Sequence, residues 1–320
     1  MPKITDEMIH PELRKTGKSW RRSAQKFSLN KTRVMKALCG LLKGRHSKEM
    51  RYEQVYIPRA DGSKLRLCVY SPLETKSNLP GVLWIHGGGY SIGVPEQDDS
   101  FILRFIKAGA CVVVSPDYTL SPDKPYPAAL EDCYSALLWL RGRGEAFGMR
   151  PDQIFVGGDS AGGGLAAALS LYARDKGEVS VAFQMPLYPM LDDRPTESSR
   201  DNDAPVWNSD LNEAAWRLYL GERYGSGDVP AYAAPARAAD YGGLPPACSY
   251  VGSIEPFLDE TAAYIKNLKK CGIPVSFKIF DGCFHGFDIM CPKTNIAKQA
   301  ADFLTENYKY AAENYFAPQK

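Results

Sequence analysis

The sequence predicts an α/β fold: a mostly parallel central sheet with helices on both faces, covered by a helical cap that the N-terminus and an insertion build together. Two observations carry this prediction. From residue 82 onward, apolar strand-like runs alternate with helix-like runs, and parallel strands need such crossover helices. This rhythm breaks over residues 191–241, which are rich in Asp, Pro, Ser and Gly and therefore indicate an insertion.

The elements follow in chain order. Asp61 and Gly62 form a turn signal between two strand-like runs, at residues 52–58 and 64–70, which predicts a hairpin. Further strands are predicted at residues 82–85, 111–114, 152–156, 181–187, 247–251 and 275–280, and helices at residues 165–172 and 210–220.

These elements divide the chain into a core and a cap. We expect N-terminal cap helices at residues 1–50, a cap insertion at 191–241, and the α/β core at 51–190 and 242–320. A chain of 320 residues is long for one domain, but α/β folds often exceed the usual domain size. A hydrophobic content of 44% is ample for a large core.

Ser160 is the predicted nucleophile. It stands in a Gly-x-Ser-x-Gly motif between a predicted strand and a predicted helix. A serine on such a turn is held in a strained conformation, and the residues two positions before and after it must be small; Gly158 and Gly162 meet that need. The alternative is a glycine-rich turn that merely joins strand and helix. A Walker phosphate loop is a worse fit, because Gly164 and Leu165 stand where Lys and Ser or Thr would follow.

A glycine loop at residues 86–89 (His-Gly-Gly-Gly) follows the predicted strand at 82–85. Consecutive glycines at a strand end cost conformational entropy, and close approach of the backbone to a ligand is the natural reason for them. The expected oxyanion donors are the backbone N–H groups of Gly88, Gly89 and Ala161. We expect His86 to brace this loop by hydrogen bonds rather than to act in catalysis.

The general base must be one of four histidines, at positions 10, 46, 86 and 285. His285 follows the predicted strand at 275–280 and a turn signal, so it lies on a loop at a strand end. His10 and His46 lie in a polar, basic stretch where solvation is expected. The alternative for His285 is a hydrogen-bonded loop histidine without a catalytic role.

Several segments resemble the hormone-sensitive-lipase-like branch of the α/β-hydrolases, also called bacterial family IV esterases. The segments that carry the resemblance are residues 86–89, 117–129, 158–163, 188–189 and 255–260. The similarity runs from about residue 50 to about residue 290. It implies an α/β-hydrolase fold, a Ser-acid-His order of the triad and hydrolysis of short- to medium-chain acyl esters.

The triad acid has two main candidates after the predicted strand at 247–251. The family block, aligned on Pro256, places Glu255 at the acid position, one methylene longer than the family's Asp. Asp259 falls in the first turn of the next predicted helix, where an acid is favoured by the helix dipole. We favour Glu255; Asp288 is a weaker third candidate. The sequence also departs from the family at Thr119, where Arg is frequent, so we expect a structural ion pair to be missing there.

The cap is expected to set the choice of substrate. Six aromatic or apolar residues are candidates to line a substrate pocket, although residues of this kind are more often ordinary core: Tyr90, Tyr188, Leu191, Trp207, Trp216 and Phe287. Two alternatives to simple ester hydrolysis remain open. One is an amidase or a carbohydrate acetyl or feruloyl esterase with the same triad, and the other is a non-catalytic small-molecule receptor on this fold.

The charge is unevenly distributed. Residues 1–50 hold 13 Lys and Arg against 4 Asp and Glu, a net charge of +9, whereas the whole chain carries +2. A basic segment of this kind meets an anionic substrate or membrane surface, or it is a solvated face of the cap helices; we expect the solvated face. No nucleic-acid-binding motif with interleaved aromatic residues accompanies the charges, so nucleic acid is not expected as a partner. A membrane is not expected as a partner either.

The remaining composition indicates an intracellular enzyme. The start of the chain has no apolar signal segment, and no stretch of about 18 apolar residues offers a membrane span. The 8 cysteines are scattered without a Cys-x-x-Cys pattern, and no His pair has zinc-ligand spacing. We expect a cytoplasmic monomer or homodimer that acts on a small ester without a cofactor or metal.

Overall fold

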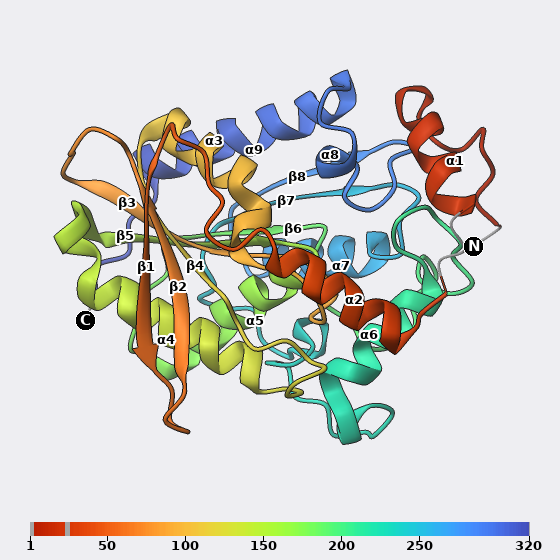
Figure 1. Cartoon of the computed structure of the whole chain (residues 1–320), viewed down its shortest axis with the longest axis horizontal. Coiled ribbons are helices and arrows are strands. Elements are labelled where there is room, and N and C mark those ends of the chain that lie inside the picture. The colour runs from red at the N-terminus through yellow and green to blue at the C-terminus, as the bar shows by residue number, and fades with distance from the viewer. Residues whose placement is uncertain (1–2, 23–25, 320) are drawn as a thin grey trace.

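The computed structural model describes residues 3–22 and 26–319 (Figure 1). Residues 1–2 and 23–25 of the predicted N-terminal cap, and residue 320 of the predicted core, lie outside the described residues.

The core of the molecule is one eight-stranded sheet in the order β1-β2-β4-β3-β5-β6-β7-β8. β1 and β2 form the predicted hairpin, β2 pairs antiparallel with β4, and every later pairing is parallel. The strands are β1 (Arg51–Pro58), β2 (Lys64–Ser71), β3 (Leu79–Ile85), β4 (Val112–Pro116), β5 (Met149–Asp159), β6 (Phe183–Leu187), β7 (Ala247–Gly252) and β8 (Val275–Phe280). The predicted mostly parallel sheet is confirmed.

Helices cover both faces of this sheet. The α-helices are α1 (Arg14–Arg22), α2 (Leu29–Gly40), α3 (Asp99–Gly109), α4 (Ala128–Arg143), α5 (Ala161–Lys176), α6 (Ser209–Leu220), α7 (Leu258–Lys270), α8 (Phe287–Met290) and α9 (Asn295–Asn314). α3 and α9 pack together over one face, and α4 and α5 pack together over the other (Figure 1).

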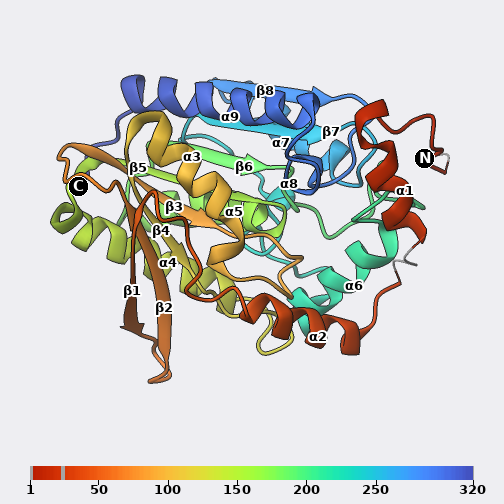
Figure 2. The same cartoon turned by 45° about the horizontal axis from the view of Figure 1, so that its top comes forward.

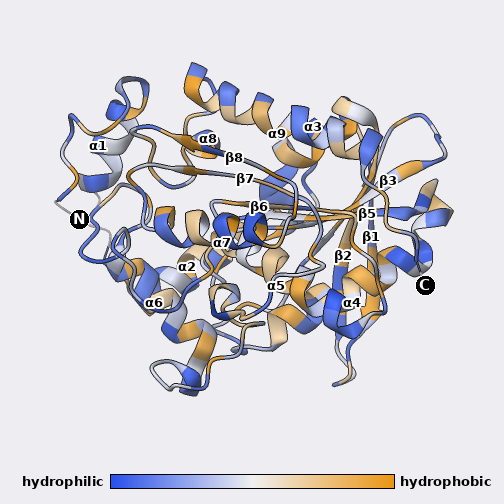
Figure 3. Cartoon of the chain, turned by 180° about the vertical axis from the view of Figure 1, so that it is seen from behind, coloured by the Kyte–Doolittle hydropathy of each residue, from blue (hydrophilic) through white to orange (hydrophobic). Residues whose placement is uncertain are grey.

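The central strands are apolar without interruption because both of their faces are buried. In β3, Leu83 and Ile85 join the cluster that includes α4 and α5, while Val82 and Trp84 join the cluster that includes α3 and α9. Successive side chains point to opposite faces, so one apolar strand fills both layers. Figure 3 shows the apolar residues concentrated along these central strands.

Helix α5 begins earlier than the sequence predicts. The sequence predicts a start at residue 165 because residues 162–164 are glycines, and each glycine disfavours a helix by about 1 kcal/mol. In the structure the helix starts at Ala161 and contains these glycines. A Cβ atom at Gly162 would lie 2.0 Å from the carbonyl oxygen of Ile85. Close packing of the helix on β3 therefore requires glycine and outweighs its low propensity.

The segment at 117–129 contacts a buried carboxylate, Asp132 of α4, which has an unexpected partner. The backbone N–H and the hydroxyl of Thr119 both donate to Asp132, each at 2.7 Å. Arg59, just after β1, donates to both oxygens of Asp132 at 2.6 and 2.9 Å. Thr119 carries no charge. The cation that pairs with Asp132 is Arg59, which comes from the β1–β2 hairpin.

The helices α1, α2 and α6 gather at the end of the sheet toward which the parallel strands run (Figure 2). The N-terminal segment also contacts the predicted insertion: Arg21 lies 3.1 Å from Asp203, and the N–H of Ile4 donates to the same carboxylate at 2.7 Å. Among the described residues, none of the helices is long and apolar enough to cross a bilayer.

Candidate active site

Ser160 lies on the turn between β5 and α5 with a strained backbone. Its φ of 56° and ψ of −121° are outside the conformations that non-glycine residues ordinarily adopt. A Cβ atom at Gly158 would lie 2.4 Å from the carbonyl oxygen of Ile85. The turn can therefore approach β3 only because glycine stands there, as the motif predicts.

His285 and Glu255 complete a hydrogen-bonded line from Ser160. The Nε2 atom of His285 lies 2.8 Å from the hydroxyl oxygen of Ser160, and its Nδ1 atom lies 2.5 Å from Oε2 of Glu255. The other oxygen of Glu255 accepts the backbone N–H of Gly252 at 2.7 Å. This second bond fixes the carboxylate, so the longer Glu side chain reaches the imidazole in a defined position.

The other two candidate acids are engaged elsewhere. Asp259 accepts the backbone N–H of Ser198 at 2.6 Å. Asp288 accepts the hydroxyl groups of Tyr250 at 2.6 Å and of Tyr188 at 3.4 Å. Of the three acids weighed from the sequence, the structure thus brings Glu255 to the imidazole of His285.

The glycine loop lies beside the turn that carries Ser160, because the N–H of Gly87 donates to Asp159 at 2.8 Å. Gly88 and Gly89 have φ values of 122° and 57°, a region that favours glycine. Within residues 3–22 and 26–319, the N–H groups of Gly88, Gly89 and Ala161 donate to no other protein atom. Ala161 also begins α5, and N–H groups at a helix start are suited to anions.

His86 is fully buried behind this loop. Its Nδ1 lies 2.8 Å from the carbonyl oxygen of Gly87, and its ring stacks on Tyr118 at 4.3 Å between centroids. Burial lowers the pKa of His86 to about 4, because the charged form loses its hydration. A neutral His86 ring can donate from Nδ1 to the carbonyl oxygen of Gly87, which is consistent with the expectation that His86 braces the loop.

A buried pair of carboxyl groups supports the loop, and sequence reasoning did not identify it. Asp159 Oδ1 accepts the N–H of Gly87 at 2.8 Å, and Asp98 Oδ2 accepts the indole N–H of Trp84 at 2.8 Å. The two aspartates also hydrogen-bond to each other. Burial raises the pKa of Asp98 well above its ordinary value and that of Asp159 to about 6. Two neighbouring carboxyls in this environment are stable when they share a proton.

The six predicted pocket residues separate into three groups. Tyr188 and Trp207 lie near His285, with ring centroids 5.0 and 6.1 Å away. Tyr90 and Trp216 pack against Tyr219 of α6 in a buried aromatic cluster. The structure places the remaining two, Leu191 and Phe287, fully buried in core clusters.

One aromatic residue beside the site was missed. Phe257 is fully buried, and its ring lies edge-on to His285 at 5.0 Å. It stands two residues after Glu255, and apolar residues at such positions are usually core. No pattern in the sequence separates it from its neighbours.

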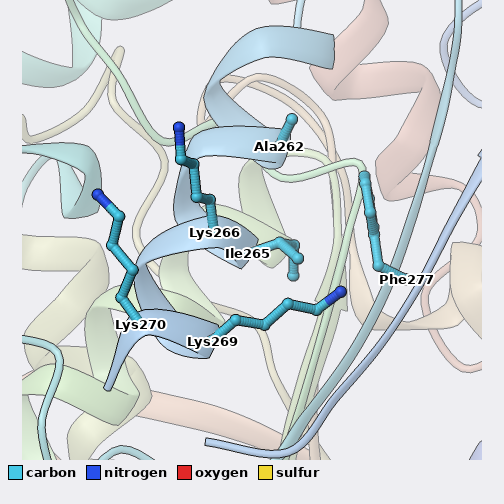
Figure 4. Close-up of a pocket in the computed structure, with 6 residues that line it drawn as sticks. All are labelled: Ala262, Ile265, Lys266, Lys269, Lys270 and Phe277. Carbon is cyan, nitrogen blue, oxygen red and sulfur yellow. The ribbon is translucent and has the colours of Figure 1, made fainter. Parts of the chain in front are cut away.

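Two hollows of the surface lie at residues other than the predicted site residues. One, of about 490 Å³, is lined by α7 and β8 residues, none of which is a predicted site residue (Figure 4). Its three lysines do not converge: Lys269 extends toward Phe277, while Lys266 and Lys270 extend the other way. Among the described residues, no group of three or more His, Cys, Asp or Glu is placed to hold a metal ion.

Several known proteins with related sequences and structures are named esterases. A family model described as the alpha/beta hydrolase fold matches residues 82–289. Carboxylesterase NlhH of Mycobacterium tuberculosis is 32% identical over 243 residues, which cover 75% of this chain and 76% of that protein. Esterase LipI of the same organism is 36% identical over 214 residues, covering 66% and 67%. The structure of a bacterial heroin esterase is similar with a TM-score of 0.87, at 33% identity over 97% of this chain and 99% of that one.

Proposed function

The chain belongs to the α/β-hydrolase family, in its hormone-sensitive-lipase-like branch, and we propose that it hydrolyses short- to medium-chain acyl esters with Ser160 as nucleophile. Its relatives are named carboxylesterases and esterases, and carboxylic ester hydrolysis is its reaction class. The observation that carries the proposal is the line Ser160–His285–Glu255, with contacts of 2.8 and 2.5 Å, beside backbone donors that bind no other described protein atom.

The first half of the reaction forms an acyl-enzyme. Nε2 of His285 takes the proton of Ser160 as the serine oxygen attacks the ester carbonyl. The N–H groups of Gly88, Gly89 and Ala161 stabilise the negative charge on the carbonyl oxygen. Glu255 accepts from Nδ1 of His285, which keeps the imidazole in the required tautomer, and does not itself take the proton. The protonated His285 then gives its proton to the leaving alcohol.

The second half frees the acid. A water molecule gives its proton to His285 while its oxygen attacks the acyl carbon, and the same N–H groups stabilise the second tetrahedral intermediate. The collapse of this intermediate returns the proton from His285 to Ser160 and releases the carboxylic acid. Each residue thus serves twice, and the site returns to its starting state.

Trp207 supports a limit on the size of the ester. A Cβ atom at Gly89 would lie 2.5 Å from the indole ring of Trp207, and the same ring lies 6.1 Å from His285 between centroids. The indole therefore stands over the space between the proposed oxyanion donors and the base. A bulky group beside the ester carbonyl would meet it.

A series of p-nitrophenyl esters from acetate to palmitate tests the function, with Ser160→Ala as the matched control. We expect turnover on the short esters and its loss in Ser160→Ala, with both proteins folded by circular dichroism. Turnover that survives in Ser160→Ala would overturn the assignment of the nucleophile. Turnover confined to an amide, or binding without turnover of any ester, would overturn the proposed reaction in favour of an amidase or a receptor.

A further inference from the structure

Helix α2 and its flanks leave a group of large apolar side chains in solvent. Six of them form what we call the α2 surface: Phe27, Leu29, Val34, Met35, Leu38 and Leu41. Their exposed fractions range from 36% for Phe27 to 66% for Leu41, and no residue of α2 is buried. A helix of a globular protein ordinarily turns its apolar side chains to the core, so this helix is oriented the opposite way.

The face of α2 that turns inward is polar or small. Residues spaced three or four apart share a helix face, and Val34, Leu38 and Leu41 have this spacing on the exposed face. Half-buried Lys36 and Gly40 share the opposite face. Ion pairs hold that side, from Lys36 to Asp123 and, just past the helix, from Lys43 to Asp117 at 2.7 Å.

A hollow also lies beside α2. It has a volume of about 530 Å³ and is lined by residues of α2, Arg33 among them, by residues of the segment at 117–123, and by Lys43, Arg59, Gly93 and Val94. In Figures 1 and 2 the helix lies on the outside of the molecule, next to α6. Among residues 3–22 and 26–319, the packing thus leaves the apolar side chains of the α2 surface exposed.

Cations accompany the α2 surface. Lys26, Lys31 and Arg33 are all exposed, and no ion pair or hydrogen bond links their side chains to any residue within 3–22 and 26–319. They belong to the segment of net charge +9, while the remainder of the chain carries −7. An apolar stripe bordered by free cations complements a surface that is apolar and negatively charged.

We propose that α2 docks on an anionic lipid–water interface. Val34, Leu38 and Leu41 enter the boundary between headgroups and acyl chains, and Lys26, Lys31 and Arg33 bind the lipid phosphates. A helix of 12 residues is only about 18 Å long, against about 30 Å for the apolar core of a bilayer, so it lies on the surface and does not span it. This proposal differs from the expectation, from the sequence, of a solvated basic face without a membrane partner.

A second copy of the chain is a poorer occupant. In a two-fold dimer each patch meets itself, so two patches of the same positive charge would be brought together. That repulsion opposes association, whereas an anionic lipid neutralises it. Docking is independent of the proposed chemistry, but it would place the cap side of the molecule at the interface where apolar esters accumulate.

Flotation of the full chain with lipid vesicles tests the proposal. The vesicles are phosphatidylcholine alone and phosphatidylcholine mixed with phosphatidylglycerol. We expect binding to the mixed vesicles, weak binding to phosphatidylcholine alone, and loss of binding in Val34→Ser with Leu38→Ser. Charge reversal in Lys31→Glu with Arg33→Glu should weaken binding by at least about 25-fold, at roughly fivefold for each cation lost.

Two controls isolate the α2 surface. Leu73→Ser removes an equally exposed apolar side chain outside α2, 53% exposed, and should bind as the original chain does. Ser160→Ala should also bind unchanged, which separates docking from the proposed reaction. Absence of binding to the mixed vesicles, or equal binding by the Val34 and Leu38 variant, would overturn the proposal. So would self-association in light scattering that the same variant abolishes, because a second copy would then cover the helix.

Discussion

Asp159 accepts the backbone N–H of Gly87 at 2.8 Å. The residue immediately before Ser160 thus holds the loop that carries the proposed oxyanion donors. The two glycine motifs lie more than 70 residues apart in the sequence, and this bond joins them into one site. The geometry of the donors therefore depends on the side chain of Asp159 as well as on the glycines.

Replacement of Asp159 should lower activity, and the loss should be larger when the new side chain has no acceptor for the N–H of Gly87. Asp159→Ala leaves the buried N–H of Gly87 without a partner, and we expect kcat to fall by about 10²-fold, the low end of the loss for one oxyanion donor. Asp159→Asn keeps the side-chain carbonyl oxygen and should lose much less. Steady-state kinetics on p-nitrophenyl acetate, with melting temperatures for both variants, checks this. Equal activity of the two variants would mean that the bond does not position the loop.

Glu255, and not Asp259, should behave as the triad acid. Glu255→Gln leaves the side chain in place but offers His285 a neutral partner, so we expect kcat to fall by about 10⁴-fold, as an amide does at this position in other triads. Asp259→Asn is the control, because Asp259 accepts from Ser198 instead, and it should keep most of the activity. Comparable losses in both variants would contradict the assignment.

The strands and the motif residues can be predicted from the sequence more fully than the surroundings of the site. Continuous apolar runs identify β3 and β5, and the glycines around Ser160 identify its turn because only glycine allows the approach to Ile85. Asp98 has no such signal: its partner Asp159 is 61 positions away, and only the fold brings the two together. Likewise, apolar character alone does not separate Trp207, beside His285, from Leu191 in the core.

The carboxyl pair should make stability depend on pH. Burial raises the pKa of Asp98 well above its ordinary value and that of Asp159 to about 6. Between the unfolded value, about 4, and the raised folded value, the native state binds more protons than the unfolded state. The contribution of such a group to the free energy of unfolding is therefore largest at low pH. It is lost as the pH rises through the pKa of the group in the folded state.

Asp98→Asn mimics the protonated carboxyl and removes one titrating group. We expect its melting temperature to fall less between pH 5 and pH 8 than that of the original chain. The amide can still accept from Trp84 and donate to Asp159, so folding should be retained. Thermal melts across this range check the prediction, and parallel pH profiles for the two proteins would contradict it.

The Arg59–Asp132 pair should matter more for stability than an exposed pair on the same hairpin. Asp132 has a side chain only 5% exposed, and Arg59 donates to both its oxygens. Arg59→Ala leaves that carboxylate without its cation and should lower the free energy of unfolding by about 3 kcal/mol. Lys124→Ala breaks an exposed pair with Asp61 and should cost less than about 1 kcal/mol. Urea unfolding measures both, and equal losses would contradict the argument.

Trp207 should limit the size of the esters that the enzyme accepts. Its indole stands over Gly89 and beside His285, so it occupies space that a larger substrate would need. Trp207→Ala should raise kcat/KM for the longest accepted ester relative to acetate by at least about 10-fold, because one methylene in an apolar pocket is worth that much. Trp139→Ala, which removes a half-buried indole packed on Phe147 of the core, is the matched control and should leave the preference unchanged.

Two substrate series show whether Trp207 limits the size of the acyl group or of the alcohol group of the ester. In one, the acyl chain lengthens with p-nitrophenol as the fixed alcohol; in the other, the alcohol lengthens with a fixed acetyl group. The series that Trp207→Ala extends identifies the part of the substrate that lies under the indole. If neither series is extended while Trp207→Ala remains folded and active, Trp207 is not a wall of the substrate site. The short-chain limit would then have to come from Phe257 and Tyr188, the other aromatic neighbours of His285.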